Sequence, residues 1–132
     1  MKRATVLLIL LVLILSACSD TENVQADNNL SVEENVRLEI ESALMKIVET
    51  PSSSSNPSDY VKASQEEYDY IVGLGNNGLN YTLNKFSISE SDGLTEYVMA
   101  MACAEILGDL NPVKEWDTGR TWYNKYVSLP AG

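Results

Sequence analysis

The sequence has 132 residues, with 19 acidic against 9 basic side chains and a formal net charge of -10. This charge argues against a nucleic-acid-binding protein, which needs clustered Lys and Arg to displace phosphate counterions. The chain contains no histidine, which excludes Ser-His-Asp catalysis, Cys-His catalysis and any His-containing zinc site within it.

The first 18 residues are typical of an export leader. Lys2 and Arg3 precede an apolar run over residues 6–15, and the sequence Leu-Ser-Ala-Cys ends at Cys18. A basic start, a short apolar core and small residues predict a secretory signal peptide over residues 1–17. The cysteine after Leu-Ser-Ala resembles the lipobox of bacterial lipoproteins, whose cysteine thiol is diacylglycerylated. The resemblance implies lipidation of Cys18 and attachment to the extracytoplasmic face of the cell membrane.

Two alternatives to the lipid anchor are an uncleaved transmembrane helix and a secreted protein whose Cys18 forms a disulfide. The apolar run is shorter than the roughly 20 residues that span a bilayer, which disfavours the first alternative. The second cysteine, Cys103, lies in an apolar stretch with no nearby cation to lower its pKa. We therefore expect Cys103 to be a buried core residue.

Cleavage before Cys18 would leave 115 residues, enough for one small domain, with 7 basic against 19 acidic residues and a formal charge of -12. That charge argues against binding to anionic lipid headgroups through the protein surface. Residues 18–29 are polar and unpatterned, which predicts a flexible tether. The predicted domain is residues 30–132.

The first predicted helix begins with Ser31 as its cap and ends near Thr50, because Pro51 disfavours helical geometry in the residue before it. Its core-facing residues recur at three- and four-residue spacing. They are Val32, Val36, Ile40, Leu44, Ile47 and Val48. The composition of residues 51–58, PSSSSNPS, predicts a loop.

Four further helices are predicted from capping residues and apolar spacing. Their expected caps are Ser64, then Asn76 or Asn77, then Ser91 or Asp92, and then Asp117 or Thr118. The third of these runs to about Leu107, is ended by Gly108, and is apolar nearly all round, so it should be the most buried. No segment alternates with period two. The sequence predicts a compact all-α domain of about four to five helices.

Gly73, Gly75 and Gly78 match the G-x-G-x-x-G fingerprint of dinucleotide-binding turns. That fingerprint requires a strand before the glycines and a parallel sheet around them. Because the neighbouring segments have helical patterns, we interpret these glycines as a link between two helices.

Two sets of residues are candidates for ligand binding. Asn80 and Asn84 give their helix an amide-rich face, and Tyr123 and Tyr126 belong to an aromatic C-terminal stretch in which Trp116 and Trp122 are expected to be core. A solvated surface is the alternative for the asparagines. The spacing of Glu66, Glu67 and Asp69 is not that of a calcium loop. The sequence predicts no catalytic residue, metal site or cofactor.

Two resemblances cover the domain. Residues 68–83, with the turn Ile-Val-Gly-Leu-Gly, and residues 93–102, GLTEYVMAMA, resemble a HEAT-type helix pair. This implies HEAT-like packing of the two helices, although asparagine stands at position 80 where HEAT units usually have proline. Residues 57–126 resemble small Firmicutes lipoproteins of uncharacterised function in their YDYI, GLTEY and WDTGRTW segments. That family supplies no activity and no catalytic residue.

The leader, the helical pattern and the lack of catalytic motifs favour a non-enzymatic, membrane-anchored module that binds a protein or peptide partner at the cell envelope. A lipoprotein that binds a small ligand or glycan is the alternative. An enzyme that uses carboxylates is a third hypothesis without a supporting motif.

Overall fold

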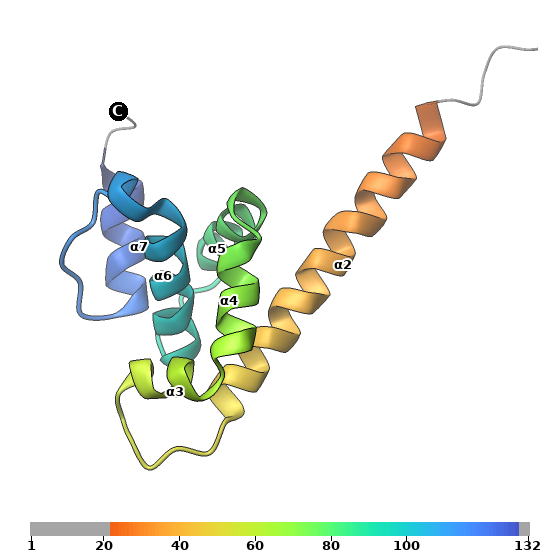
Figure 1. The fold of residues 1–132 in the computed structure, drawn as a ribbon. Helices are drawn as coiled ribbons and strands as arrows, with labels where there is room; N and C mark the ends of the chain where they lie inside the picture. Colours follow the sequence, from red (N-terminus) through yellow and green to blue (C-terminus); the bar gives the residue numbers. More distant parts are fainter. Residues whose placement is uncertain (1–21, 130–132) are drawn as a thin grey trace, which may run out of the picture. The chain divides into compact units, whose positions relative to one another are not determined.

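A computed structural model describes residues 22–129, with side chains from residue 31 onward (Figure 1). The helices are α2 (Glu22–Glu49), α3 (Pro57–Ala63), α4 (Gln65–Gly73), α5 (Asn76–Ser87), α6 (Leu94–Leu107), the 3-10 helix η1 (Gly108–Leu110) and α7 (Gly119–Ser128). No strand occurs between residues 22 and 129. The predicted all-α class is confirmed, with six α-helices in this range where four to five were expected.

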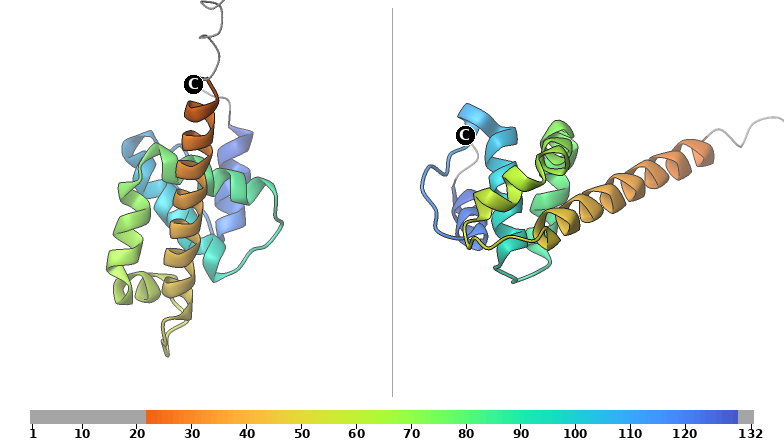
Figure 2. Two further views of the ribbon diagram at one scale, coloured as in Figure 1. Left: turned by 90° about the vertical axis from the view of Figure 1, so that its right-hand side faces the viewer. Right: turned by 60° about the horizontal axis from the view of Figure 1, so that its bottom comes forward.

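The chain divides into a unit before Asn35 and a compact unit from Asn35 onward. Within the second unit, α6 contacts α3, α4, α5 and α7, and its contact with α7 is the most extensive. Figures 1 and 2 show α6 between α7 on one side and α4 and α5 on the other. Five α6 residues are buried, as its apolar sequence predicts: Val98, Met99, Ala100, Ala102 and Cys103.

Helix α2 ends where the sequence predicts but begins earlier. It ends at Glu49, before Pro51, and Thr50 donates its hydroxyl hydrogen to the Lys46 carbonyl oxygen over 2.8 Å. It begins at Glu22 rather than at Ser31, so residues 22–29, expected to be part of a flexible tether, are helical. The composition of this segment gives no local reason for the helix, because three asparagines, an aspartate and a valine, all with low helix propensity, outnumber Glu, Gln and Ala.

The residues predicted to face the core from α2 are buried only in the second half of the helix. Ile40, Leu44 and Ile47 are buried, whereas Val32 is 58% exposed. Val36 packs against the core as a partly buried residue. The apolar spacing therefore identified the face of α2 correctly but not where that face is covered.

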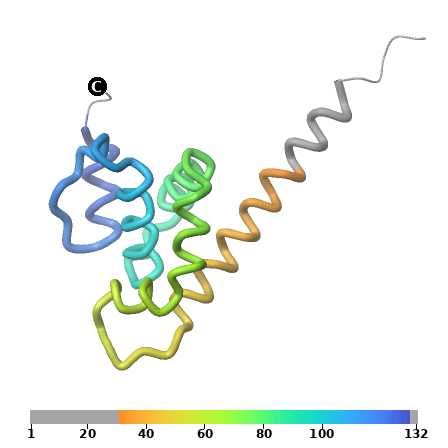
Figure 3. Tube along the Cα trace, in the orientation of Figure 1, coloured from red at the N-terminus to blue at the C-terminus, as the bar shows by residue number. Residues whose placement is uncertain are grey.

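The sequence patterns predict no helix at the position of α3, which begins inside the predicted loop. The loop runs from α2 to Asn56, and Figure 3 traces it into α3. Asn56 caps α3 by accepting a hydrogen bond from the Ser58 N–H over 3.1 Å, and Pro57 is the first helical residue. Asparagine before proline is a known start of a helix, and the serine-rich composition of the segment obscured it.

Two of the predicted capping residues have other roles. Ser64 precedes α4, but its hydroxyl is 2.7 Å from the Thr50 hydroxyl instead of capping the helix. Helix α6 is preceded by Gly93, whose N–H donates to the Glu96 carboxylate over 2.8 Å, so Ser91 and Asp92 are not its caps. Thr118 caps α7 as predicted and accepts from the Thr121 N–H over 3.1 Å.

The glycine motif is a helix link, as the sequence interpretation holds. Residues 70–72 belong to α4, and Gly75 stands between α4 and α5 with φ of 55°, a left-handed conformation that favours glycine. An added Cβ at Gly78 would lie 2.7 Å from the Ile71 carbonyl oxygen, so this glycine allows α5 to approach α4 closely. Gly75, not Asn76 or Asn77, occupies the cap position of α5.

Candidate functional site

The clearest candidate for a binding site is a groove between α2 and the connection from α5 to α6. We call it the α2–α5 groove; its volume is about 470 Å³. Its apolar lining comes from α2 and from the residue that follows α5: Leu44, Met45, Val48 and Ile88. Lys85, Ser89, Ser91, Thr95, Glu96 and Glu41 complete the lining with polar groups.

The apolar residues of this groove differ sharply in exposure. Leu44 is 2% exposed and belongs to the core, whereas Met45 is 55% exposed and Ile88 is 78% exposed. Exposed apolar side chains scattered singly are common on protein surfaces. Here Met45 and Ile88, far apart in the chain, line one groove together with the core residue Leu44, so their exposed surfaces belong to one apolar lining.

An ion pair borders the groove. The Lys85 ammonium lies 2.6 Å from the Glu41 carboxylate, and the Tyr81 hydroxyl donates to the same carboxylate. Partial burial acts to raise the pKa of Glu41, but the hydrogen bonds from Lys85 and Tyr81 and the positive charge of Lys85 hold it below its ordinary value. The pair fixes α5 to α2 beside the apolar lining.

Arg120 of α7 holds the α5–α6 connection from behind. Its guanidinium donates to the carbonyl oxygens of Phe86 over 2.9 Å, Ser91 over 3.1 Å, and Ser89. The same group lies over the rings of Phe86 and Tyr123, at 5.1 Å and 5.4 Å from their centroids. Because Ser89 and Ser91 line the groove, Arg120 sets the position of one groove wall.

Arg120 reaches the connection because α7 begins unusually close to α6. An added Cβ at Gly119 would lie 2.1 Å from the Glu96 carbonyl oxygen, so no larger residue fits without moving a helix. The Arg120 N–H also donates to the Asp92 carboxylate over 3.1 Å. Thr118, Gly119 and Arg120 thus cap α7, bring it against α6, and anchor the connection.

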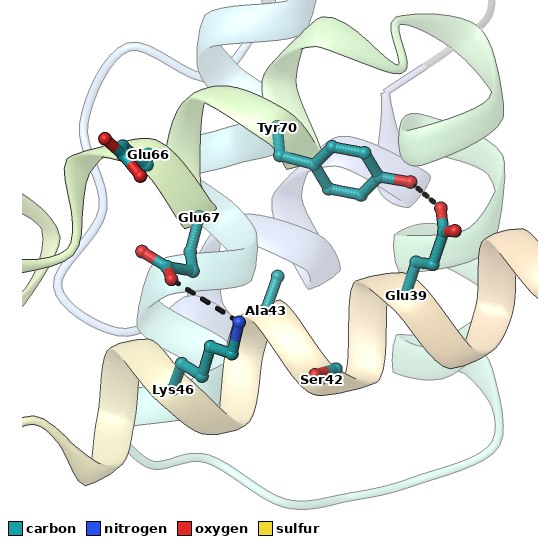
Figure 4. Close-up of a pocket in the computed structure, with 7 residues that line it drawn as sticks. All are labelled: Glu39, Ser42, Ala43, Lys46, Glu66, Glu67 and Tyr70. Carbon is teal, nitrogen blue, oxygen red and sulfur yellow. Dashed lines mark hydrogen bonds and ion pairs between the residues drawn. The ribbon is translucent and has the colours of Figure 1, made fainter.

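A second groove lies on another side of α2, between α2 and α4, with a volume of about 330 Å³ (Figure 4). Its lining is mostly polar and charged: Glu39, Ser42, Ala43, Lys46, Glu66, Glu67 and Tyr70. Figure 4 shows the Tyr70 hydroxyl directed at Glu39 at one end and Lys46 directed at Glu67 at the other. The hydrogen bond to Glu39 raises the pKa of Tyr70 above its ordinary value.

The residues predicted as ligand-binding lie on two helices, outside both grooves. Asn80 and Asn84 are exposed on α5. On α7, the Tyr123 ring stacks on Phe86 with centroids 5.0 Å apart, and the Tyr126 ring stacks on Trp122 with centroids 5.1 Å apart. One face of each tyrosine ring is therefore occupied within the protein. Cys18 lies outside the described residues, as does the whole predicted signal peptide.

The sequence interpretation missed Met45, Ile88 and Arg120. Met45 lies next to the α2 stripe rather than within it, and Ile88 stands alone in a segment that otherwise reads as a polar link. An isolated large apolar residue in a polar link is the signal in the sequence that points to Ile88. The role of Arg120 depends on contacts with residues about thirty positions earlier in the chain, which no local pattern shows.

Within residues 31–129, the groups relevant to metal or thiol chemistry are the carboxylates and Cys103. Over the range with described side chains, no group of three or more Cys, Asp and Glu residues could hold a metal ion. Cys103 is fully buried as predicted, and burial raises its pKa to about 12 although Thr82 donates a hydrogen bond that opposes the shift. A neutral, enclosed thiol is unreactive.

Across the described part of the chain, no helix is both long enough and apolar enough to cross a bilayer. The chain matches no known family model, no curated protein sequence and no solved structure. Helix α5 packs on α6. The HEAT and lipoprotein resemblances both stay predictions.

Proposed function

We propose that this protein is a lipid-anchored lipoprotein of the bacterial cell envelope that binds a protein or peptide and catalyses no reaction. The binding proposal rests on one observation: Met45 and Ile88 line a common groove with most of their surface open to solvent. Leaving two large apolar side chains exposed forgoes roughly 25 cal/mol per Å² of burial. A bound polypeptide would bury these two side chains and recover that free energy.

The alternative of a small-ligand or glycan site has less support. A glycan platform needs open aromatic faces, and the Tyr123 and Tyr126 rings are half-buried, each with one face already covered by another ring of the core cluster. The asparagines Asn80 and Asn84 offer amides but no enclosing wall, since both are exposed on one helix.

Differential capture tests the binding proposal. The full-length chain and its Met45→Gln and Ile88→Asn variants would be purified from their membranes in detergent, and co-purifying proteins compared by quantitative mass spectrometry. Leu110→Asn is the matched control, because Leu110 is 83% exposed and is not a lining residue of the groove. We expect a partner retained by wild type and by Leu110→Asn and depleted in the two groove variants. Equal recovery by all four proteins would contradict the proposal.

The anchor has its own test, because it depends on residues outside the described range. The leader sequence supports lipidation at Cys18, and two or more acyl chains give stable attachment where one gives only weak binding. A Cys18→Ala variant should lose incorporation of labelled palmitate and should leave the membrane fraction. Membrane retention of the variant without label would contradict the lipid anchor and leave the groove unaffected.

A further inference from the structure

Four carboxylates and three cations lie in or beside the α2–α5 groove. Glu41 and Glu96 line it, and Glu90 and Asp92 lie in the α5–α6 connection that forms its wall. The cations are Lys85, which is 2.6 Å from Glu41, Arg120, which binds the carbonyl oxygens of the connection, and Arg37, whose charge also acts on Glu41. The surroundings of the groove are therefore net negative.

Lys85 and Arg120 have internal partners, whereas the carboxylates of the connection are exposed to solvent, with Asp92 also accepting from the Arg120 N–H over 3.1 Å. Lys85 is bound to Glu41, and the Arg120 guanidinium is held by carbonyl oxygens and two aromatic rings. Glu90 and Asp92 are exposed, and Glu96 is half-buried with its carboxylate accepting from a backbone N–H. A molecule bound in the groove would contact the apolar side chains of the lining. Beside them it would find the carboxylates of Glu90, Asp92 and Glu96, which we call the acidic edges.

We propose that the α2–α5 groove binds a basic amphipathic segment of a partner protein, with apolar side chains against Met45 and Ile88 and Lys or Arg beside the acidic edges. This inference rests on the proposed function and specifies the partner. Charge complementarity selects the occupant, because opposite charges at the edge of an interface speed encounter and suppress wrong partners. An apolar groove read by side chains at helical spacing is a common way to recognise peptides.

The same charges disfavour other occupants. A membrane surface rich in anionic lipid, or a nucleic acid, would repel the acidic edges. A second copy of this chain would bring an identical acidic edge to the groove, and like charges held together are unfavourable. A basic amphipathic segment satisfies both the apolar centre and the edges.

The test uses the full-length chain in detergent and three fluorescent synthetic peptides. The first has Leu at helical spacing and Lys on its other face, the second replaces each Lys by Glu, and the third has the composition of the first with its Leu residues redistributed around the helix. Fluorescence anisotropy gives the three dissociation constants. We expect the first peptide to bind at least about tenfold more tightly than either of the others, with affinity that falls as salt screens the edges.

Variants separate the apolar and the charged contributions. Met45→Gln and Ile88→Asn should each weaken binding of the basic peptide about tenfold through lost apolar burial, without changing the charge of the groove. Glu96→Gln keeps an acceptor for the Gly93 N–H while removing a charge, and should weaken binding about two- to fivefold and reduce its salt dependence. Leu110→Asn and Glu115→Gln, both outside the groove, are the matched controls and should bind as wild type does.

Four results would overturn the inference. Equal or tighter binding of the Glu peptide would remove the charge argument, and unchanged binding by Met45→Gln and Ile88→Asn would place the contact elsewhere. A concentration-dependent dimer that Met45→Gln abolishes in sedimentation would show that a second copy covers the groove. If differential capture identifies a groove-dependent partner that is acidic at the contact, the proposed function survives and this inference fails.

Discussion

The two grooves that flank α2 share this helix as one wall, and they differ in how far their lining side chains have partners within the protein. In the α2–α4 groove, Tyr70 bonds to Glu39 and Lys46 pairs with Glu67, so much of the polar lining has partners within the protein. In the α2–α5 groove, Met45 and Ile88 have no comparable cover. An internally paired polar groove gains little from a partner, whereas an uncovered apolar groove gains the burial of its side chains. The α2–α5 groove is therefore the better candidate site.

Gly119→Ala should have the largest effect on stability. It disrupts the packing of α7 on α6, which positions a wall of the α2–α5 groove and not of the α2–α4 groove. The added Cβ would overlap the Glu96 backbone and force α7 away from α6, which carries Arg120 away from the α5–α6 connection. We expect a loss of about 3 kcal/mol in the free energy of unfolding, measured by urea denaturation. The control is Gly73→Ala, where nothing lies within 4 Å of the added Cβ, and its stability should stay close to that of wild type. A small effect of Gly119→Ala would show that α6 and α7 can separate without loss.

Arg120→Met should affect the α2–α5 groove and spare the α2–α4 groove. It removes charge-assisted hydrogen bonds to the connection, which contribute about 2 kcal/mol together when the group is half-buried. Hydrogen exchange should become faster over residues 87–93 while the amides of α4 keep their protection. Arg120→Lys keeps the charge without the planar donor geometry and should give an intermediate rate. If Arg120→Met changed the exchange rates of residues 87–93 no more than those of α4, the connection would not depend on Arg120.

Glu39→Gln tests whether the α2–α4 groove is internally paired. The Glu39 carboxylate accepts from the Tyr70 hydroxyl and raises the pKa of that tyrosine, so its removal should lower the Tyr70 pKa toward the ordinary value of about 10. Ultraviolet titration of the tyrosines follows this change. Binding of the basic peptide should be unaffected, since neither residue lines the α2–α5 groove. An unchanged tyrosine titration would contradict the pairing.

Glu41→Gln should have the smallest effect, and that effect should depend on pH. Because Lys85 and Tyr81 hold the pKa of Glu41 below its ordinary value, the ionised carboxylate stabilises the fold above the unfolded-state pKa of about 4.3. This contribution is lost as the pH falls through the lower folded-state pKa. The free energy of unfolding of wild type, measured by urea denaturation, should thus exceed that of the variant by up to about 1 kcal/mol at pH 7. The difference should disappear below about pH 4. A gap that widens on acidification would contradict the assigned shift.

Most of the fold could be predicted from the sequence because its helices carry local information. The apolar spacing of α2, the all-round apolar character of α6 and the Thr118 cap of α7 each depend on residues a few positions apart. Helix α3 was missed because a seven-residue helix offers too few turns to show a period, and its Asn56-Pro57 start lies within a serine-rich stretch.

The candidate site could not be predicted because it is formed by residues distant in the chain. Met45 and Ile88 are separated in the sequence by α3, α4 and α5, and they line one groove only in the folded chain. Periodicity marks which side chains turn inward, and it does not say which outward side chains share a groove. The predicted residues Tyr123 and Tyr126 were chosen for their aromatic character, and the structure stacks both on core rings.

The most direct test of the difference between the two grooves is photocrosslinking from one residue in each. A photoreactive amino acid would replace Ile88 in the α2–α5 groove or Tyr70 in the α2–α4 groove of the full-length chain, and cells producing each protein would be irradiated. We predict a polypeptide adduct from position 88, reduced when Met45→Gln is also present, and none of comparable yield from position 70. Adducts of equal yield from both positions, or an adduct from position 70 alone, would contradict the assignment of the binding site to the α2–α5 groove.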